Sequence, residues 1–209
     1  MTIAVIAIQG NVEEHIHALK QAMQKQKLDE EIVPVKHKGI IPHCDGIVLP
    51  GGESTTLCRL MKHEGIDVEI IDAAKQDKPI LATCAGLISL AKSGGKQARK
   101  TKQHLLGIMD IEVDRNTFGR QSDSFEVPIN ISFLDTPYNA VFIRAPKIVR
   151  VGKNVEVIAR FGEDIVGAKQ KNIIGLAFHP ELTDDLRVHQ YYLQLVRTQC
   201  QGPPPFPQV

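Results

Sequence analysis

The sequence has almost no net charge. Its 25 lysine and arginine residues nearly balance its 24 aspartate and glutamate residues, which leaves a formal charge of +1 over 209 residues. Binding to nucleic acid or to an anionic membrane through the surface field requires a marked basic excess. We therefore expect no nucleic-acid or membrane partner, and any other partner has to be inferred from a specific site.

Cysteine is scarce, and its spacing is wide. The cysteines form no Cys-x-x-Cys pair, so the sequence indicates neither a disulfide framework nor a zinc site. We expect reduced thiols in a cytoplasmic protein that holds no metal and no other cofactor. The four cysteines are Cys44, Cys58, Cys84 and Cys200.

Long apolar runs are absent as well. The apolar stretch at 3–8 has no basic leader and is ended by Gln9-Gly10-Asn11, so it is too short for the core of a signal peptide or for a membrane span. It predicts a first buried strand instead. Without an internal repeat or a linker, the 43% hydrophobic content predicts one domain over 1–200. We expect the proline-rich tail, 201–209, to be disordered.

Strand and helix patterns alternate in the first half of the chain. After the strand at 3–8, apolar residues recur at helical spacing from Val12 to Met23. The segments 45–49 and 79–83 predict two more strands, and each is followed by a helical pattern. This alternation predicts a parallel sheet that is covered by helices.

The second half predicts short strands joined by turns, which we expect to be antiparallel additions to the sheet. The segment 184–199 predicts a closing helix, and the polar segment 94–103 predicts a solvated loop. The expected fold is a single-domain, flavodoxin-like three-layer α/β sandwich: a mixed, mostly parallel sheet with helices on both faces. The later strands are expected at 108–113, 141–145, 155–161, 165–169 and 173–178.

Cys84 lies where a predicted strand runs directly into a predicted helix. The small neighbours Ala82, Ala85 and Gly86 permit a sharp turn there, as in a nucleophile elbow. A thiol at a helix N-terminus is favoured as the thiolate by the helix dipole and the unpaired N–H groups. Cys84 is therefore a candidate nucleophile, although an isolated buried cysteine is more often structural.

His179 and Glu181 are two residues apart at the end of an apolar run. In an extended chain, side chains at this spacing point the same way, which suits a base and the carboxylate that orients it. The alternative interpretation is a strand that ends at Pro180 with two polar side chains facing water.

The pair Gly51-Gly52 also ends a predicted strand. It is either a simple turn or one half of an oxyanion hole formed by backbone N–H groups of Gly52 and Ala85. Ligands of such sheets bind beyond the carboxyl ends of the parallel strands. We therefore expect Gly52, Cys84 and His179 to converge at that edge.

Five sequence blocks resemble one enzyme family. In order and motif they are similar to the glutaminase subunit of the two-component pyridoxal phosphate synthase, a class I glutamine amidotransferase. The Arg-Asn-x-Phe-Gly-Arg-Gln motif at 115–121 separates this family from other class I glutaminases, and the resemblance extends from residue 3 to about residue 197. The blocks are 50–56, 82–87, 114–126, 141–146 and 178–183, and residues 7–15 fit the same pattern.

The resemblance implies hydrolysis of L-glutamine to glutamate and ammonia through a cysteine thioester. Cys84 would be the nucleophile, His179 its base and Glu181 the residue that orients the histidine. An arginine suits the α-carboxylate of the substrate through charge-assisted hydrogen bonds. The sequence departs from the family at Ala82, where glycine is usual. The glutamine contacts implied are Gly52, Glu53, Ser54, Arg115, Ile143 and Arg144.

The same resemblance implies a partner. Ammonia released into neutral water is protonated and lost as a nucleophile, so a glutaminase of this kind works beside a site that consumes ammonia. The family's partner is the synthase subunit, which builds pyridoxal 5'-phosphate (vitamin B6), and we expect a large hetero-oligomer with it. Gln9, Gly10 and His15, beside the expected mouth of the site, are candidates for sensing that partner.

Two other functions fit part of the pattern. A cysteine peptidase or deglycase-like enzyme on a related sheet shares the elbow and the histidine, but does not need the Gly-Gly-Glu-Ser run at 51–54. A non-enzymatic redox-sensing protein needs only one reactive thiol, at Cys84. Labelling of Cys84 by a glutamine-analogue diazoketone, blocked by glutamine, favours the glutaminase over the peptidase. In a redox-sensing protein, replacement of His179 should leave function intact.

Overall fold

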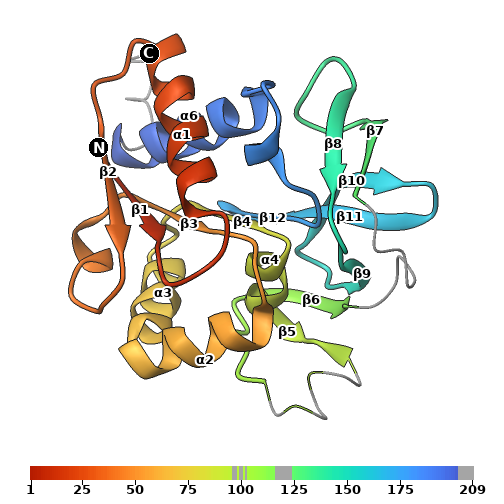
Figure 1. Ribbon diagram of the computed structural model, residues 1–209, viewed down its shortest axis with the longest axis horizontal. Coiled ribbons are helices and arrows are strands. Elements are labelled where there is room, and N and C mark those ends of the chain that lie inside the picture. The colour runs from red at the N-terminus through yellow and green to blue at the C-terminus, as the bar shows by residue number, and fades with distance from the viewer. Residues whose placement is uncertain (96–97, 99–100, 102, 116–123, 202–209) are drawn as a thin grey trace, which may run out of the picture.

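A central sheet carries helices on both of its faces (Figure 1). The computed structural model describes residues 1–95, 98, 101, 103–115 and 124–201. On one face lie α1 (Val12–Lys25) and α6 (Arg187–Gln201), and on the other lie α2 (Ser54–Glu64), α3 (Ile66–Lys75) and α4 (Ala85–Leu90). None of the described helices is long and apolar enough to cross a membrane.

The strand order confirms the mixed, mostly parallel arrangement expected in the first half of the chain. All neighbouring pairs from β2 to β12 are parallel. In spatial order the strands are β2 (Glu31–Val35), β1 (Thr2–Ile6), β3 (Gly46–Leu49), β4 (Ile80–Thr83), β12 (Ile173–Leu176), β11 (Asp164–Gln170), β9 (Lys147–Val151), β6 (Met109–Asp114) and β5 (Ala91–Ser93), with β10 (Glu156–Phe161) paired to β11.

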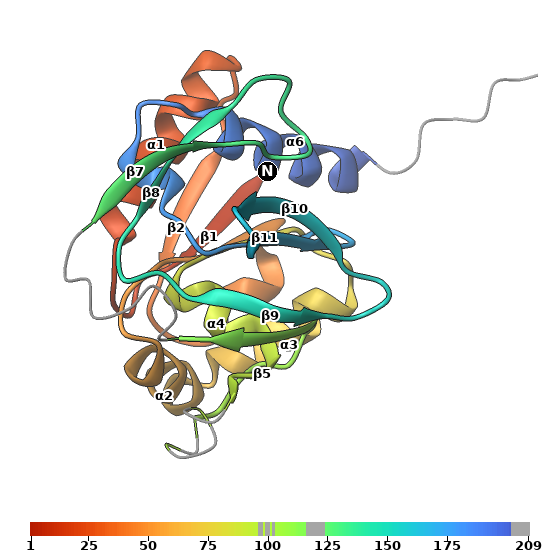
Figure 2. The ribbon, with the colours of Figure 1, turned by 90° about the vertical axis from the view of Figure 1, so that its right-hand side faces the viewer.

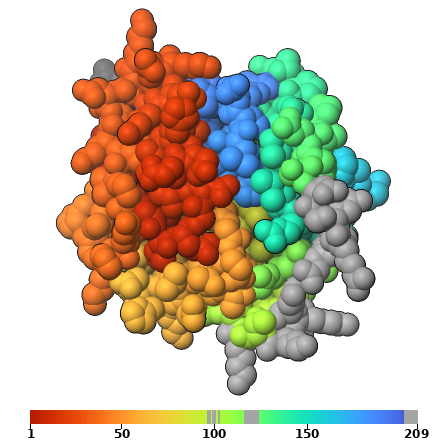
Figure 3. All heavy atoms as spheres, viewed as in Figure 1, coloured from red at the N-terminus to blue at the C-terminus, as the bar shows by residue number. Residues whose placement is uncertain are grey.

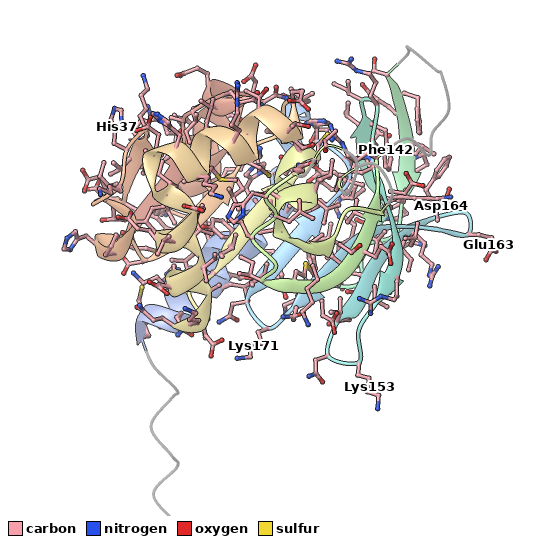
Figure 4. All side chains as sticks on the ribbon, turned by 90° about the horizontal axis from the view of Figure 1, so that it is seen from below. His37, Phe142, Lys153, Glu163, Asp164 and Lys171 are labelled. Carbon is pink, nitrogen blue, oxygen red and sulfur yellow. The ribbon has the colours of Figure 1, made fainter. Side chains whose placement is uncertain are left out.

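The second half adds antiparallel strands, as expected, but the prediction is wrong for β12, which pairs in parallel with β4 on one side and antiparallel with β11 on the other. β11 pairs antiparallel with β12, β9 and β10, and Figure 2 shows β10, β11, β9 and β5 one below another on this side of the molecule. The turns between these strands lie at the periphery, where Figure 4 shows Lys153, Glu163 and Lys171.

Four details differ from the prediction. β8 (Tyr138–Phe142) ends before the expected 145, because Arg144 takes a left-handed φ of +42° that no strand accommodates. β8 pairs with β7 (Phe125–Ile129) in a separate ladder. Gly95, Ala98 and Thr101 have helical backbone in the segment predicted as a loop, and Gln201, assigned to the tail, closes α6. The rest of the predicted tail lies outside the described residues.

β3, β4 and β12 form the buried centre of the sheet. Each is a run of four buried residues, as expected of parallel strands covered on both faces. Leu49 lies opposite Ala82, and Thr83 lies opposite Leu176. The carboxyl ends of the three strands therefore share one edge, and the segments that follow them, 50–54, 84–86 and 177–181, meet there.

Candidate active site

A cavity of about 370 Å³ opens at this edge of the sheet. In Figure 3 the segments that build it, coloured red, orange and teal, meet near the centre of the face. Within the described part of the chain, no group of three or more His, Cys, Asp or Glu is placed to hold a metal ion. The lining residues are Asn11, Gly52, Glu53, Ser54, Cys84, Ile88, Arg115, Ile143, Arg144 and His179.

Cys84 occupies a sharp turn between β4 and α4. Its φ of +48° lies in a region that a non-glycine residue rarely adopts, and its N–H donates to the carbonyl of Leu176 at 2.8 Å. Gly86 makes the turn possible, because a Cβ there would strike the carbonyl oxygen of Leu49. Ala82 is a regular, buried residue of β4, so its methyl group does not disturb the turn. The backbone thus has the elbow that the sequence predicted.

His179 follows β12 and is held between two side chains. Its ring lines the cavity beside Cys84 on one side, and its Nδ1 lies 2.7 Å from Glu181 Oε1 on the other. Its backbone N–H donates to the carbonyl of Val141 at 2.8 Å. Cys84, His179 and Glu181 are therefore in contact in that order.

The route by which Glu181 reaches His179 differs from the prediction. The residues do not alternate along an extended strand, because Pro180–Leu182 form a 3₁₀ turn, η2, directly after His179. Proline fixes a φ that suits the first position of such a turn. The two side chains still face each other, but across the turn.

Burial and pairing shift the pKa values of His179 and Glu181 in opposite directions. Burial alone would lower the pKa of His179, but Cys84 and Glu181 beside it raise it to about 10. Burial alone would raise the pKa of Glu181, but His15 and His179 hold it at about 2. A carboxylate beside a protonated imidazole is therefore stable in this buried position at neutral pH.

Two side chains that the motifs did not indicate also reach Glu181. Asn11 Nδ2 donates to Glu181 Oε1 at 3.2 Å, and His15 Nε2 lies 3.3 Å from Glu181 Oε2. His15 has no solvent exposure, so it lies behind the site and not at its mouth. The signal that could have found this pair is its spacing, because residues i and i+4 share one face of a helix.

Glu53 and Arg115 form an ion pair on one wall of the cavity. Arg115 Nη2 donates to Glu53 Oε1 at 2.9 Å, and Nη1 donates to Thr55 Oγ1 and to Gln103 Oε1, each at 3.0 Å. Glu53 also caps α2 by accepting from the N–H groups of Thr55 and Thr56. Although burial alone would raise the pKa of Glu53, these backbone hydrogen bonds lower it to about 2. One carboxylate and one guanidinium thus face the cavity together.

The remaining predicted contacts also surround the cavity. Ser54 is buried, and its hydroxyl has no hydrogen-bond partner among the residues that the structure describes. Ile143 and Arg144 also line the cavity. Gly52 lines the cavity with a φ of +137°, where a side chain would collide with Gln9. Ala85 is the first residue of α4, so its N–H has no acceptor within the helix.

Comparisons with known proteins find one family and several curated relatives. The model of the SNO glutamine amidotransferase family matches residues 5–198. The chain is 61% identical over 193 residues to pyridoxal 5'-phosphate synthase subunit PdxT of Methanococcoides burtonii, which covers 92% of this chain and 98% of that protein. It is 50% identical over 198 residues to the PdxT subunit of Archaeoglobus fulgidus, which covers 95% of this chain and all of that protein.

Two solved structures have the same backbone fold as this chain. A crystal structure of a glutamine amidotransferase superimposes with a TM-score of 0.82 at 36% sequence identity, over 94% of this chain and 99% of the other. PurLQS from Thermotoga maritima superimposes with a TM-score of 0.64 at 18% identity, over 94% of this chain and 96% of the other, and shares the fold.

Proposed function

The chain belongs to the SNO glutamine amidotransferase family, and from this membership we propose that its cavity hydrolyses the side-chain amide of L-glutamine. The protein is a glutaminase that supplies ammonia for the synthesis of pyridoxal 5'-phosphate. Its relatives are named pyridoxal 5'-phosphate synthase subunit PdxT. The observation that supports the assignment to this cavity is the contact chain from Cys84 through His179 to Glu181. We refer to these three residues as the proposed triad.

The first half of the reaction uses the elbow. The Cys84 thiolate attacks the amide carbon of glutamine, and the carbonyl oxygen takes up the negative charge. Backbone N–H groups of Gly52 and Ala85 are our candidates for stabilising this oxyanion. His179, which holds a proton beside Cys84, protonates the leaving nitrogen, so that ammonia departs and a thioester remains.

The second half uses the same histidine in the opposite direction. His179, now neutral, takes a proton from water as the water attacks the thioester carbon, and the C–S bond breaks to release glutamate. Glu181 accepts the Nδ1–H of His179 throughout, which fixes the tautomer and leaves Nε2 for the reacting groups. Glu181 itself transfers no proton.

The charged pair on the cavity wall suits the other end of glutamine, which carries an α-carboxylate and an α-ammonium group. Arg115 would bind the carboxylate, and Glu53 beside it would bind the ammonium group. The buried hydroxyl of Ser54 offers a polar contact that the protein itself leaves free among the described residues. Ile143 and Arg144 would close the opposite side.

A synthase subunit is the partner of this glutaminase, because the relatives are subunits of pyridoxal 5'-phosphate synthase. We propose that the two kinds of subunit assemble into a large hetero-oligomer, in which ammonia passes from this cavity to the synthase without entering bulk water.

The test is ammonia release from glutamine by the purified chain, alone and mixed with its cognate synthase subunit. We expect release that rises with the synthase and is lost in Cys84→Ala. Labelling by a glutamine-analogue diazoketone should modify Cys84, and glutamine should prevent it. Ammonia release that persists in Cys84→Ala would reject the proposed nucleophile.

A further inference from the structure

Gln103 connects Arg115 to helix α2. It lies in the segment that the sequence predicts as a solvated loop, but its side chain is hydrogen-bonded at both ends. Its Oε1 accepts from Arg115 Nη1 at 3.0 Å, and its Nε2 donates to Cys58 Sγ on α2 at 3.4 Å. Gln103 is not among the residues that line the cavity, whereas Arg115 is. Any effect of Gln103 on a ligand in the cavity therefore passes through a neighbour, and Arg115 is the neighbour that faces the ligand.

The partners of Gln103 determine which way its amide points. Arginine has only hydrogen-bond donors, so the amide must turn its oxygen toward Arg115. The NH2 group then faces Cys58, whose sulfur accepts. Cys58 is buried, and burial raises the pKa of its thiol, so the acceptor is a neutral group on a helix. A flipped amide would set two donors against each other at Arg115, and this orientation is therefore the favoured one.

Arg115 Nη1 has an acceptor for each of its two N–H groups. These acceptors are Gln103 Oε1 and Thr55 Oγ1, each at 3.0 Å, whereas Nη2 donates to Glu53 Oε1 at 2.9 Å. A guanidinium presents five N–H donors in one plane. Within the part of the chain that the structure describes, the donors left without an acceptor are the Nε–H and one N–H of Nη2.

We propose that Gln103 is a positioning residue for glutamine binding: with Thr55 it holds Nη1, so that Arg115 presents Nη2 and Nε to the α-carboxylate of the substrate. This inference rests on the proposed role of Arg115 and adds one residue to it. An arginine side chain loses rotamer freedom when it is ordered. Because Gln103 and Thr55 order Arg115 before the substrate arrives, less of that loss opposes binding.

The experiment measures the Kd of L-glutamine by isothermal titration calorimetry, in the complex of the chain with its cognate synthase subunit. Every variant also carries Cys84→Ala, so that glutamine binds without being hydrolysed. In Gln103→Met, which keeps the length of the side chain and removes its amide, we expect Kd to rise about threefold to thirtyfold. In the chain that retains Cys84, the same substitution should raise KM and change kcat by less than about twofold.

Gln170 is a matched control for the loss of a glutamine that is hydrogen-bonded at both ends. Its Oε1 accepts from the N–H of Asp110 at 2.8 Å, and its Nε2 donates to the carbonyl of Ile108 at 3.2 Å. These contacts lie at the start of β6, whereas Arg115 follows its end. Gln170→Met should therefore leave the Kd of glutamine within about twofold of the parent value.

Two comparisons separate the positioning of Arg115 from general damage. In the Arg115→Met background, Gln103→Met should have little further effect on Kd, because the group that Gln103 holds is gone. Glutamine α-amide, which has no α-carboxylate, should bind to Gln103→Met and to its parent with Kd values within about twofold of each other. Thermal melts establish that each variant is folded, and Gln103→Ala replaces a methionine variant that is not. If either binding is too weak to measure, the comparison of Gln103→Met with Gln170→Met decides.

The possible results are distinguishable. An unchanged Kd in Gln103→Met, an equal rise in Gln170→Met, or an undiminished rise in the Arg115→Met background or with glutamine α-amide would overturn the role of Gln103. If the folded Cys84→Ala complex binds no glutamine at all, the proposed function itself is overturned, and the inference falls with it.

Discussion

His179 Nδ1 and Glu181 Oε1 lie 2.7 Å apart, and both side chains are closed off from solvent. At this distance the imidazole is fixed in orientation, and its Nδ1–H is committed to the carboxylate. The other nitrogen is left for Cys84 and the substrate.

Cys84→Ala and Glu181→Gln should both lower kcat for glutamine hydrolysis, but to different extents. Loss of the nucleophile should reduce turnover to background, whereas Glu181→Gln should leave a measurable remnant, with kcat lower by roughly 10³- to 10⁴-fold. Steady-state ammonia release with the synthase subunit measures both. Cys200→Ser, which changes an exposed thiol on α6, should match the wild type. Equal residual rates in the two triad variants would contradict the separate roles.

Glu181 should also make the folded state sensitive to acid. Its pKa is lowered from 4.5 to about 2 on folding, so its stabilising contribution is complete above pH 4.5 and is lost as the pH falls toward 2. The difference in unfolding free energy between wild type and Glu181→Gln should therefore shrink between pH 6 and pH 3 in urea titrations. Glu163→Gln, at an exposed turn, is the control. A difference that stays constant over this range would contradict the prediction.

Arg115→Met should weaken glutamine binding more than it slows the chemical step. The guanidinium is proposed to hold the α-carboxylate, and the loss of a charge-assisted hydrogen bond should raise KM by roughly tenfold to a hundredfold. Arg150→Met removes an exposed guanidinium that pairs with Asp110 away from the cavity, and should leave KM unchanged. An unaltered KM in Arg115→Met would assign the carboxylate to another residue.

Gly86→Ala should destabilise the fold and impair the elbow together. The new methyl group meets the carbonyl oxygen of Leu49, and overpacking of this kind costs about 1–3 kcal/mol, or roughly 3–10 °C in Tm for a chain of this length. Because the start of α4 must shift, kcat should fall as well. Gly107→Ala, where the added methyl group meets open space, should lower Tm less and leave kcat intact. A thermal shift assay with parallel kinetics measures both effects.

The centre of the fold was predictable from local pattern. Ile80–Thr83 and Ile173–Leu176 are apolar runs that end in functional motifs, and burial on both faces of a parallel sheet requires such runs. The edge of the sheet was not predictable from local pattern. β2 contains Pro34 and buries only Val35 fully, as an edge strand can, so it has no strong apolar pattern.

In the candidate site, too, some residues were predictable from local pattern and others were not. Cys84, His179 and Glu181 stand in local motifs that the sequence itself displays. Asn11 and His15 share one face of α1, but their contact with Glu181 arises because α1 packs against η2, which is a tertiary relationship that their spacing does not contain. The 3₁₀ turn at Pro180–Leu182 likewise depends on its packing, which includes the hydrogen bond from Tyr138 to the carbonyl of Pro180.

The position of β12 has a consequence for how the protein is made. This strand lies between β4 and β11, yet Thr83 is synthesised long before Ile173. Until the last fifth of the chain leaves the ribosome, β4 has an open edge, and His179 and Glu181 do not yet exist beside Cys84. A nascent chain therefore carries an unpaired apolar strand that needs protection from aggregation. With the proposed triad, it also cannot hydrolyse glutamine before its sheet is complete.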